Sequence, residues 1–215
     1  MTLKKHDKFL TDIFTEGSSL PLIDQFYSLQ GEGYHTGKAA YFVRVGGCDI
    51  GCQWCDEKIT WSPSIHKAVS IKEIISKTSE SGSNSLVMTG GEPCIYNLEP
   101  ITILAHKNNI ETYLETSGAY PITGKWDWIC VSPKPQEGAL KENLLKADEL
   151  KIIIFDDDDI KWAEECAEKV APNCRLYLQP EWSRHKEKIP QIVEYIKKNP
   201  KWKISIQAHK FMKIP

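Results

Sequence analysis

Three cysteines lie close together in this 215-residue chain, in the arrangement Cys48-x-x-x-Cys52-x-x-Cys55. They occupy a glycine-bearing loop, and three thiolates on one short loop can bind three irons of a cubane iron–sulfur cluster. Such a cluster normally takes four cysteines, so one iron would stay open to a chelating ligand. The alternative is a zinc site, which would need a fourth ligand such as His35 or His66.

A second motif, Thr-Gly-Gly-Glu-Pro, occupies positions 89–93 at the end of an apolar run. Its adjacent glycines let a backbone edge approach a ligand closely. Glu92 supplies a carboxylate that could accept hydrogen bonds from an ammonium group. Taken alone, the motif is equally compatible with an ordinary turn.

The elements that must position these motifs follow from the hydrophobic pattern. Helical spacing with a capping box at Ser70 and Glu73 predicts one helix, and apolar spacing predicts others at 97–108, 157–171 and 189–198. Apolar, β-branched runs between them predict seven strands, at residues 40–45, 85–88, 112–114, 128–131, 151–155, 175–178 and 203–206. Alternating strands and helices indicate an α/β fold with a parallel sheet, and the apolar strands indicate burial on both faces.

Candidate polar groups recur at the carboxyl ends of these predicted strands. In β/α barrels that end is the active-site face, so we expect the groups to meet there. Any one of them could be a loop or capping residue, but six in succession favour a shared site. They are Cys48, Thr89 to Glu92, Glu115 to Gly118, Ser132 to Lys134, Gln179 to Glu181 and Gln207 to His209.

Length and composition limit the class of protein. A chain with 41% hydrophobic and 26% charged residues fits one domain, expected at 21–215 after an N-terminal extension of residues 1–20. The formal net charge of -2 gives no broad basic field, so nucleic acid is not an expected partner. No stretch is apolar enough for a secretory signal or a membrane span, so we expect a cytoplasmic protein that does not bind membranes.

The cysteine count supports a cluster rather than disulfides. The chain has seven cysteines, an odd number, and no export signal is evident. Those outside the loop are scattered, and a free cysteine is commonly a small core residue. We therefore expect buried or unused thiols at Cys94, Cys130, Cys166 and Cys174.

The two motifs together resemble the signature of the radical S-adenosylmethionine superfamily, Cys-x-x-x-Cys-x-aromatic-Cys followed by Gly-Gly-Glu. The resemblance implies a [4Fe-4S] cluster whose open iron chelates S-adenosylmethionine, and an external one-electron reductant. The cofactors carry the hard chemistry, and the protein supplies position and electrostatics. By the same resemblance, the S-adenosylmethionine pocket would be lined by Trp54, Gly91, Glu92, Ser117, Ser132, Lys134 and Gln179.

Three further polar residues flank the first predicted strand: Gln30, Glu32 and Arg44. An amide and a carboxylate can pair with the ring N–H and exocyclic amine of a pterin or purine. Arginine can grip a carboxylate bidentately. The set therefore suits a small pterin or purine ligand with an acidic group, although the Gln-Gly-Glu-Gly loop also has a plausible turn explanation.

With these residues, the chain closely resembles the 7-carboxy-7-deazaguanine synthase family over about residues 22–215. The shared motifs are Ser-Leu-Gln-Gly-Glu-Gly, Phe-x-Arg, the cysteine loop, Thr-Gly-Gly-Glu-Pro, Glu-Thr-Ser-Gly, Ser-Pro-Lys and a terminal Gln-x-His-Lys. The resemblance implies an abbreviated β/α barrel, a homodimer and a lyase. Its reaction converts 6-carboxy-5,6,7,8-tetrahydropterin to 7-carboxy-7-deazaguanine with loss of ammonia, in queuosine and 7-deazapurine biosynthesis. The pterin would be held by Gln30, Glu32, Arg44, Thr89, His209 and the terminal carboxylate of Pro215.

One position departs from the family pattern. The family often has Asp-Thr after the third cysteine, where the threonine ligates Mg²⁺, whereas this chain has Asp56-Glu57. A glutamate carboxylate can bind Mg²⁺, so Glu57 is a candidate ligand. It could instead occupy the place of the metal or point elsewhere.

Two other functions compete with the deazaguanine-forming lyase. One is a glycyl-radical-enzyme activase, and the other is a non-catalytic zinc or electron-transfer module.

Overall fold

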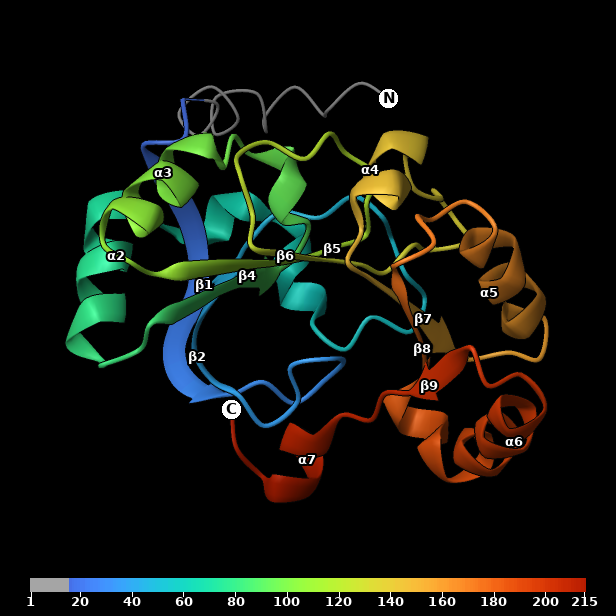
Figure 1. Ribbon diagram of the computed structural model, residues 1–215. Helices are drawn as coiled ribbons and strands as arrows, with labels where there is room; N and C mark the ends of the chain where they lie inside the picture. Colours follow the sequence, from blue (N-terminus) through green and yellow to red (C-terminus); the bar gives the residue numbers. More distant parts are fainter. Residues whose placement is uncertain (1–15) are drawn as a thin grey trace.

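The computed structural model describes residues 16–215 as a strongly curved sheet with helices around its outer side (Figure 1). Within these residues, nine strands form one sheet in the order β3-β1-β2-β4-β5-β6-β7-β8-β9. The ends of this order, β3 and β9, do not pair with each other, so the sheet is an open, partial barrel. In the same range, no helix is long and apolar enough to cross a membrane.

Seven strands of the sheet are parallel and two are not. β1 pairs antiparallel with both of its neighbours, β2 and β3, and all other pairs are parallel. The strands are β1 (Ser19–Leu29), β2 (Ala39–Val45), β3 (Lys67–Ser70), β4 (Ser85–Gly90), β5 (Glu111–Thr116), β6 (Trp128–Val131), β7 (Glu149–Ile154), β8 (Arg175–Pro180) and β9 (Trp202–Ile204).

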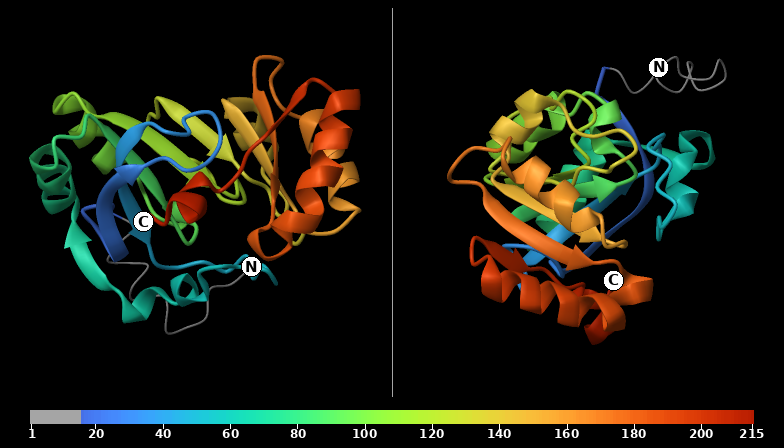
Figure 2. Two further views of the ribbon diagram at one scale, coloured as in Figure 1. Left: turned by 90° about the horizontal axis from the view of Figure 1, so that it is seen from below. Right: turned by 90° about the vertical axis from the view of Figure 1, so that its right-hand side faces the viewer.

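Most helices pack on the outer side of the sheet. α2 contacts β1 and β3, α3 contacts β5, α4 contacts β6, α5 contacts β7, and α6 contacts β8 and β9. α7 instead lies across the open side of the curved sheet, where its edges do not meet (Figure 2). The helices are α2 (Ile71–Glu80), α3 (Glu99–Lys107), α4 (Lys141–Lys146), α5 (Asp159–Ala167), α6 (His185–Lys198) and α7 (Ala208–Met212), with 3-10 turns η1 (Lys58–Trp61), η2 (Pro63–Ile65), η3 (Pro93–Ile95) and η4 (Trp182–Arg184).

The two faces of the sheet carry different side chains, because successive strand residues point to opposite faces. On β7, Ile152 and Ile154 belong to the hydrophobic core beneath the helices. Lys151 and Ile153, which alternate with them, face the interior of the partial barrel and line its cavity. Leu114 and Glu115 on β5 divide in the same way. The helices thus cover an aliphatic face, and the interior keeps polar groups.

A loop at residues 30–38, which we call the floor loop, closes the end of the barrel at which the parallel strands begin. Its Tyr34 ring stacks on Trp128, the first residue of β6, with ring centroids 4.8 Å apart. The Tyr34 backbone N–H donates to Glu149, the first residue of β7, at 3.1 Å. The Arg175 guanidinium, at the start of β8, lies 4.3 Å from the Tyr34 ring centroid. The opposite end, where the strands finish, carries the candidate site.

All seven predicted strands and the partial-barrel fold class are confirmed, and Ser70 caps α2 by accepting a 3.2 Å hydrogen bond from the Glu73 N–H. β1 and β3 were not predicted. β1 contains Pro21 and Asp24, which interrupt the strand pattern, and β3 has four residues of which only Val69 is buried. β1 begins at Ser19, inside the expected N-terminal extension of residues 1–20, and residues 1–15 of that extension lie outside the described residues.

Candidate active site

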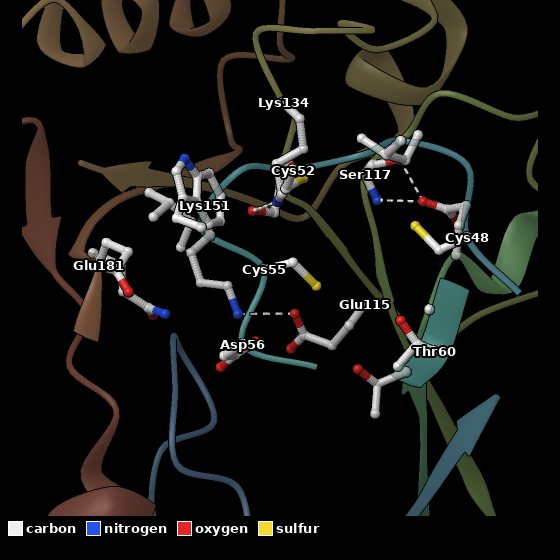
Figure 3. A pocket seen from close by; sticks show the side chains of 18 of the residues that line it. Cys48, Cys52, Cys55, Asp56, Thr60, Glu115, Ser117, Lys134, Lys151 and Glu181 are labelled. Atoms are coloured by element: carbon white, nitrogen blue, oxygen red, sulfur yellow. Dashed lines mark hydrogen bonds and ion pairs between the residues drawn. The ribbon is translucent and has the colours of Figure 1, made fainter. Parts of the chain in front are cut away.

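One cavity of about 240 Å³ opens at the carboxyl ends of the parallel strands (Figure 3). Both cysteine-loop and strand-end residues face it, so motifs far apart in the sequence share a single space. Its lining comprises Glu32, Cys48, Ile50, Cys52, Trp54, Cys55, Asp56, Thr60, Thr89, Gly90, Gly91, Glu92, Glu115, Thr116, Ser117, Ser132, Lys134, Lys151, Ile153, Gln179, Pro180, Glu181, Trp182 and Gln207.

The cysteine loop directly follows β2 and forms backbone hydrogen bonds with η1. Gly47 has a φ of +99°, a left-handed conformation that glycine adopts without strain. Its N–H donates to the Thr60 carbonyl at 2.5 Å, and the Cys48 N–H donates to the Trp61 carbonyl at 3.4 Å. The Cys55 N–H closes a turn onto the Cys52 carbonyl at 3.2 Å. These contacts fix the loop against the rest of the fold.

The three thiols fit a cluster better than a single metal ion. Cys48, Cys52 and Cys55 are free and line the cavity, and Figure 3 shows the sulfurs of Cys48 and Cys55 pointing into it. Among residues 16–215, no three His, Cys, Asp or Glu side chains gather closely enough to hold one ion. A cubane cluster has no such requirement, because each thiolate binds a different iron. The donor set therefore fits the cluster.

Neither histidine considered as a fourth zinc ligand faces the cysteines. The His66 ring nitrogen Nε2 lies 2.9 Å from the Ile59 carbonyl oxygen. The His35 ring stacks on Tyr113, with centroids 4.6 Å apart, at the other end of the barrel. Burial raises the pKa of the Cys48 thiol to about 12 and also raises that of Cys52. Binding of a metal must therefore displace protons from these thiols.

The Gly-Gly pair allows β4 to approach the cysteine loop. Gly90 has a φ of +115°, and a Cβ on it would lie 2.3 Å from the Val45 backbone nitrogen. A Cβ on Gly91 would lie 2.3 Å from the Gly47 carbonyl oxygen. That same oxygen accepts a 2.8 Å hydrogen bond from the Glu92 N–H. The second motif is thus packed directly on the first.

The Glu92 carboxylate is buried and held by four donors. One oxygen accepts from the Cys94 N–H at 3.0 Å and from the Thr116 hydroxyl at 2.5 Å. The other accepts from the Ser117 N–H at 2.8 Å and from the Ser117 hydroxyl (Figure 3). With both oxygens anchored, this carboxylate has one fixed position on the cavity wall, suited to a positively charged ligand.

The remaining residues predicted for S-adenosylmethionine lie on the same cavity. The Lys134 ammonium donates to the Ser132 carbonyl at 2.6 Å and to its hydroxyl at 2.7 Å, and lies 5.7 Å from the Trp54 ring centroid. Burial lowers the pKa of Lys134. The Gln179 side-chain oxygen accepts from the Ser205 hydroxyl at 2.6 Å. The structure therefore brings the seven predicted residues and the three cysteines together.

Of the residues predicted to bind the pterin, some line the cavity and others do not. Glu32 and Thr89 line the cavity, whereas Gln30, Arg44, His209 and Pro215 are outside its lining. Gln30 stays close, because its side-chain amide donates to the cavity-lining Glu115 at 3.3 Å.

Arg44 is engaged by two carboxylates outside the cavity. Its guanidinium donates to Asp24 through two hydrogen bonds of 2.7 and 2.5 Å, and lies 3.6 Å from a Glu57 oxygen. The Glu57 side chain is 41% exposed and does not line the cavity, whereas the preceding Asp56 does. A ligand that needs Arg44 would have to compete with Asp24.

His209 and Pro215 lie on the C-terminal segment, which crosses the open side of the barrel. The Ala208 N–H donates to the Gly31 carbonyl at 2.9 Å, and the His209 ring packs so closely that a Cβ on Gly31 would clash with it. Burial lowers the pKa of His209. The Ser28 hydroxyl donates to the Pro215 backbone oxygen at 3.1 Å. His209 therefore packs on Gly31, between Gln30 and Glu32, and Pro215 lies at Ser28 on β1.

Sequence reasoning missed an ion-pair network on the cavity wall. The Lys151 ammonium lies 2.6 Å from Glu32 and 2.9 Å from Glu115. Gln207 donates to the second Glu32 oxygen at 3.0 Å. Burial opposes ionisation of Glu32, but Lys151 and the hydrogen bonds prevail and lower its pKa to about 2. The sequence gives no clear signal for Lys151, because Ile153 on the same face of β7 is as apolar as Ile152 and Ile154 on the other.

The charges of the cavity favour a cationic ligand. Its lining includes five carboxylates and two ammonium groups, in addition to the three cysteines. Within a partly enclosed site such an excess of negative charge attracts a positively charged molecule more strongly than it would in water. The sulfonium and ammonium groups of S-adenosylmethionine match this potential.

An open β/α barrel with a three-cysteine loop and a Gly-Gly-Glu strand end, both on one cavity, defines the radical S-adenosylmethionine class of enzymes. Residues 29–124 match the family described as a 4Fe-4S single cluster domain. The crystal structure of QueE from Escherichia coli matches with a TM-score of 0.79 and 30% identity, covering 93% of this chain and 98% of that chain.

Sequence relatives narrow the class to one family. The 7-carboxy-7-deazaguanine synthase of Flavobacterium psychrophilum is 46% identical over 200 residues, covering 93% of this chain and 95% of the relative. That of Synechocystis sp. is 41% identical over 194 residues, covering 90% and 93%. The chain belongs to the 7-carboxy-7-deazaguanine synthase family.

Proposed function

We propose that this chain converts 6-carboxy-5,6,7,8-tetrahydropterin to 7-carboxy-7-deazaguanine with release of ammonia, as a step of queuosine and 7-deazapurine biosynthesis. The observation that carries the proposal is the shared cavity, in which the cysteine loop, Glu92 and Glu32 face one space. Family membership and the printed names of the relatives support the substrate and the product.

In this proposal Cys48, Cys52 and Cys55 hold the [4Fe-4S] cluster beside the pocket for S-adenosylmethionine. When bound, the two cofactors supply the one-electron cleavage and hydrogen abstraction that start the reaction. The protein orients them: the fixed carboxylate of Glu92 accepts hydrogen bonds from the ammonium group of the methionine part. Trp54, Gly91, Ser117, Ser132, Lys134 and Gln179 complete the pocket wall.

The pterin is placed on the side of the cavity lined by Glu32 and Thr89. Carboxylate oxygens of Glu32 accept hydrogen bonds from N–H groups of the pterin edge. Gln30, Arg44, His209 and the Pro215 carboxylate surround this side from the floor loop, β2 and the C-terminal segment. For Arg44, binding the substrate carboxylate requires exchange of its ion pair with Asp24.

The present residues do not support a magnesium site at Glu57. Its carboxylate is directed to Arg44 at 3.6 Å and lies outside the cavity lining. Mg²⁺ prefers several oxygen ligands in octahedral geometry, and residues 16–215 hold no group of three acidic or histidine side chains close enough to share an ion. We therefore assign no step of the reaction to Mg²⁺.

The partners belong to the proposal as well. The reaction needs an external reductant that supplies one electron to the cluster. The family resemblance supports a homodimer in the cytoplasm. Neither nucleic acid nor membrane is required for this chemistry.

The test uses the full chain, reconstituted anaerobically with iron and sulfide and then reduced. It is incubated with S-adenosylmethionine and 6-carboxytetrahydropterin, with and without Mg²⁺, and the products are analysed by mass spectrometry. We expect 7-carboxy-7-deazaguanine, and Cys52→Ala is the control that should form none. Turnover of S-adenosylmethionine without the deazaguanine would contradict this substrate and favour another radical reaction, such as activation of a glycyl radical enzyme.

A further inference from the structure

Lys151 carries a buried charge at a position where fold stability does not require one. Its side chain is 5% exposed and faces the barrel interior from β7, between neighbours that pack outward in the aliphatic core. Replacing a buried ion pair by apolar residues is often neutral or stabilising, because the desolvation of the charges offsets their attraction. A reason for this lysine must therefore be sought in the cavity that it lines.

The lysine joins two carboxylates from different parts of the chain. Its Nζ donates to one oxygen of Glu32, in the floor loop, at 2.6 Å. It also donates to one oxygen of Glu115, on β5, at 2.9 Å (Figure 3). The other oxygens accept from Gln207 at 3.0 Å and from Gln30 at 3.3 Å. All four oxygens of the pair are thus held by protein donors.

The two carboxylates still have unused acceptor capacity. An ionised carboxylate offers about four acceptor positions. Each of the pair uses two in these contacts, and Gln179 and Cys130 are further neighbours for Glu32 and Glu115, respectively, which leaves about one position on each. Both side chains line the cavity. A ligand with two N–H groups on one edge can occupy the positions that remain, and the amino-pyrimidinone ring of a pterin has such an edge.

We propose that Lys151 is a positioning residue for the pterin: it holds Glu32 and Glu115 side by side, both ionised, as paired acceptors for N–H groups of the substrate. This inference rests on the pterin reaction proposed above. Without the lysine, two buried carboxylates would face each other without a shared cation, and one of them would take up a proton.

Other titratable groups face this pair and set the baseline for any measurement. Burial lowers the pKa of His209, which approaches Glu32 from α7. Glu149 and Cys130 face Lys151 from β7 and β6, and burial raises the pKa of both. Lys134 approaches from the loop after β6. The charge of Lys151 acts on all four groups, so the Lys151→Met profile must be compared with that of a variant that differs from it only at Glu32.

The test compares Lys151→Met with the wild-type enzyme from about pH 5.5 to about pH 8.5. In the wild type, Glu32 has a pKa of about 2 and stays ionised over this range. In Lys151→Met, burial raises the pKa of Glu32, so the acceptor is lost as the pH falls. We expect the KM for 6-carboxytetrahydropterin to rise about 10- to 100-fold and to rise further toward low pH.

Three variants separate positioning from a general structural effect. Lys151→Arg keeps the charge and should not acquire the new pH dependence of KM. Adding Glu32→Gln to Lys151→Met should remove that dependence, because the amide does not titrate. Lys188→Met is the matched control: Lys188 is 1% exposed and lies 2.6 Å from Asp157, outside the cavity lining. It should leave the KM profile unchanged.

Cluster content, measured by iron analysis, should be the same in Lys151→Met and the wild type. A KM in Lys151→Met that is close to wild type and equally flat with pH overturns the inference. If Lys151→Met yields no folded protein, Lys151→Gln replaces it with the same expected result. Failure of the wild type to form the deazaguanine would instead refute the pterin reaction itself, so the two failures are distinguishable.

Discussion

Glu92 accepts hydrogen bonds from two backbone N–H groups and two hydroxyls, so a change of one atom in its side chain has a defined cost. In Glu92→Gln, the amide nitrogen must face either the Cys94 N–H or the Ser117 N–H. A hydroxyl can rotate to accept from the amide, but a backbone N–H cannot. One buried donor then loses its partner, which costs about 1–3 kcal/mol.

We expect Glu92→Gln to lower the free energy of unfolding by that amount and to weaken S-adenosylmethionine binding about tenfold or more. Chemical denaturation and a binding titration measure the two effects. Glu142→Gln, at an exposed position of α4, is the control that should change neither. A Glu92→Gln protein with wild-type stability would show that these donors do not require the carboxylate.

Substitutions at Cys52 and Arg44 should impair different activities of the enzyme. Cys52→Ala removes a cluster ligand, so we expect loss of iron, of S-adenosylmethionine cleavage and of deazaguanine formation together. Arg44→Ala leaves the cavity lining intact, so iron content and cleavage should persist while pterin conversion falls. Iron analysis, 5′-deoxyadenosine release and product formation distinguish the two patterns. Equal loss of iron in both variants is the outcome that these roles do not allow.

At the scale of single residues, all seven residues predicted for S-adenosylmethionine line the cavity, whereas only Glu32 and Thr89 of the six predicted for the pterin do. Glu92 and Lys134 stand in recognisable strand-end motifs, so their placement could be predicted. Lys151 stands at the start of an apolar run, where a lysine usually belongs to solvent. Its inward direction depends on which face of β7 the helices cover, and that becomes evident only in the assembled sheet.

The two glycine-rich elements of the site are coupled by direct packing. A Cβ at position 91 would meet the Gly47 carbonyl oxygen at 2.3 Å, and a backbone atom cannot rotate away as a side chain can. We expect Gly91→Ala to displace the cysteine loop from β4, and so to reduce both iron content after reconstitution and S-adenosylmethionine binding.

Gly138→Ala is the matched control for this prediction. Gly138 also has a positive φ, of +72°, but nothing lies within 4 Å of a Cβ placed there. The substitution should cost only about 1–2 kcal/mol of backbone strain and leave the iron content unchanged. If Gly91→Ala binds iron as the wild type does, the close approach of the two loops is not needed to form the cluster site.

Elements that alternate in the β/α pattern were predictable, whereas those outside it were not. The seven parallel strands are mostly apolar, and helices separate most of them, so the hydrophobic pattern identifies them. β1 follows neither pattern, because it is antiparallel, contains Pro21 and is mostly half-buried. α4 and α7 have six and five residues, too few for a periodic signal.

At the scale of the whole molecule, the sheet does not close, so the C-terminal segment completes the enclosure. Figure 2 shows α7 across the open side of the barrel, where the edges of the sheet do not meet. Three contacts attach this segment to distant parts of the fold: Lys210 to Asp56 at 3.0 Å, Ala208 to Gly31 at 2.9 Å and Pro215 to Ser28 at 3.1 Å. The first of these reaches a residue next to Cys55, and the last reaches β1.

The cluster loop is fixed by η1, by β4 and by the Lys210–Asp56 contact, all of which remain when residues 213–215 are deleted, so the deletion should affect one half of the site only. We expect unchanged iron content and S-adenosylmethionine cleavage, and a rise in the KM for 6-carboxytetrahydropterin of about tenfold or more, since a charged acceptor is removed from the pterin side. Steady-state kinetics with the full-length protein as reference measures this rise.

Addition of one glycine after Pro215 tests whether the position of the terminal carboxylate matters, because it keeps every side chain and moves only the charge. It should raise KM in the same direction as the deletion. A deletion that lowers cleavage of S-adenosylmethionine in the absence of pterin would contradict the division, because it would make the C-terminal segment a support for the whole cavity. Retention of wild-type KM in both variants would place the terminal carboxylate outside the pterin site.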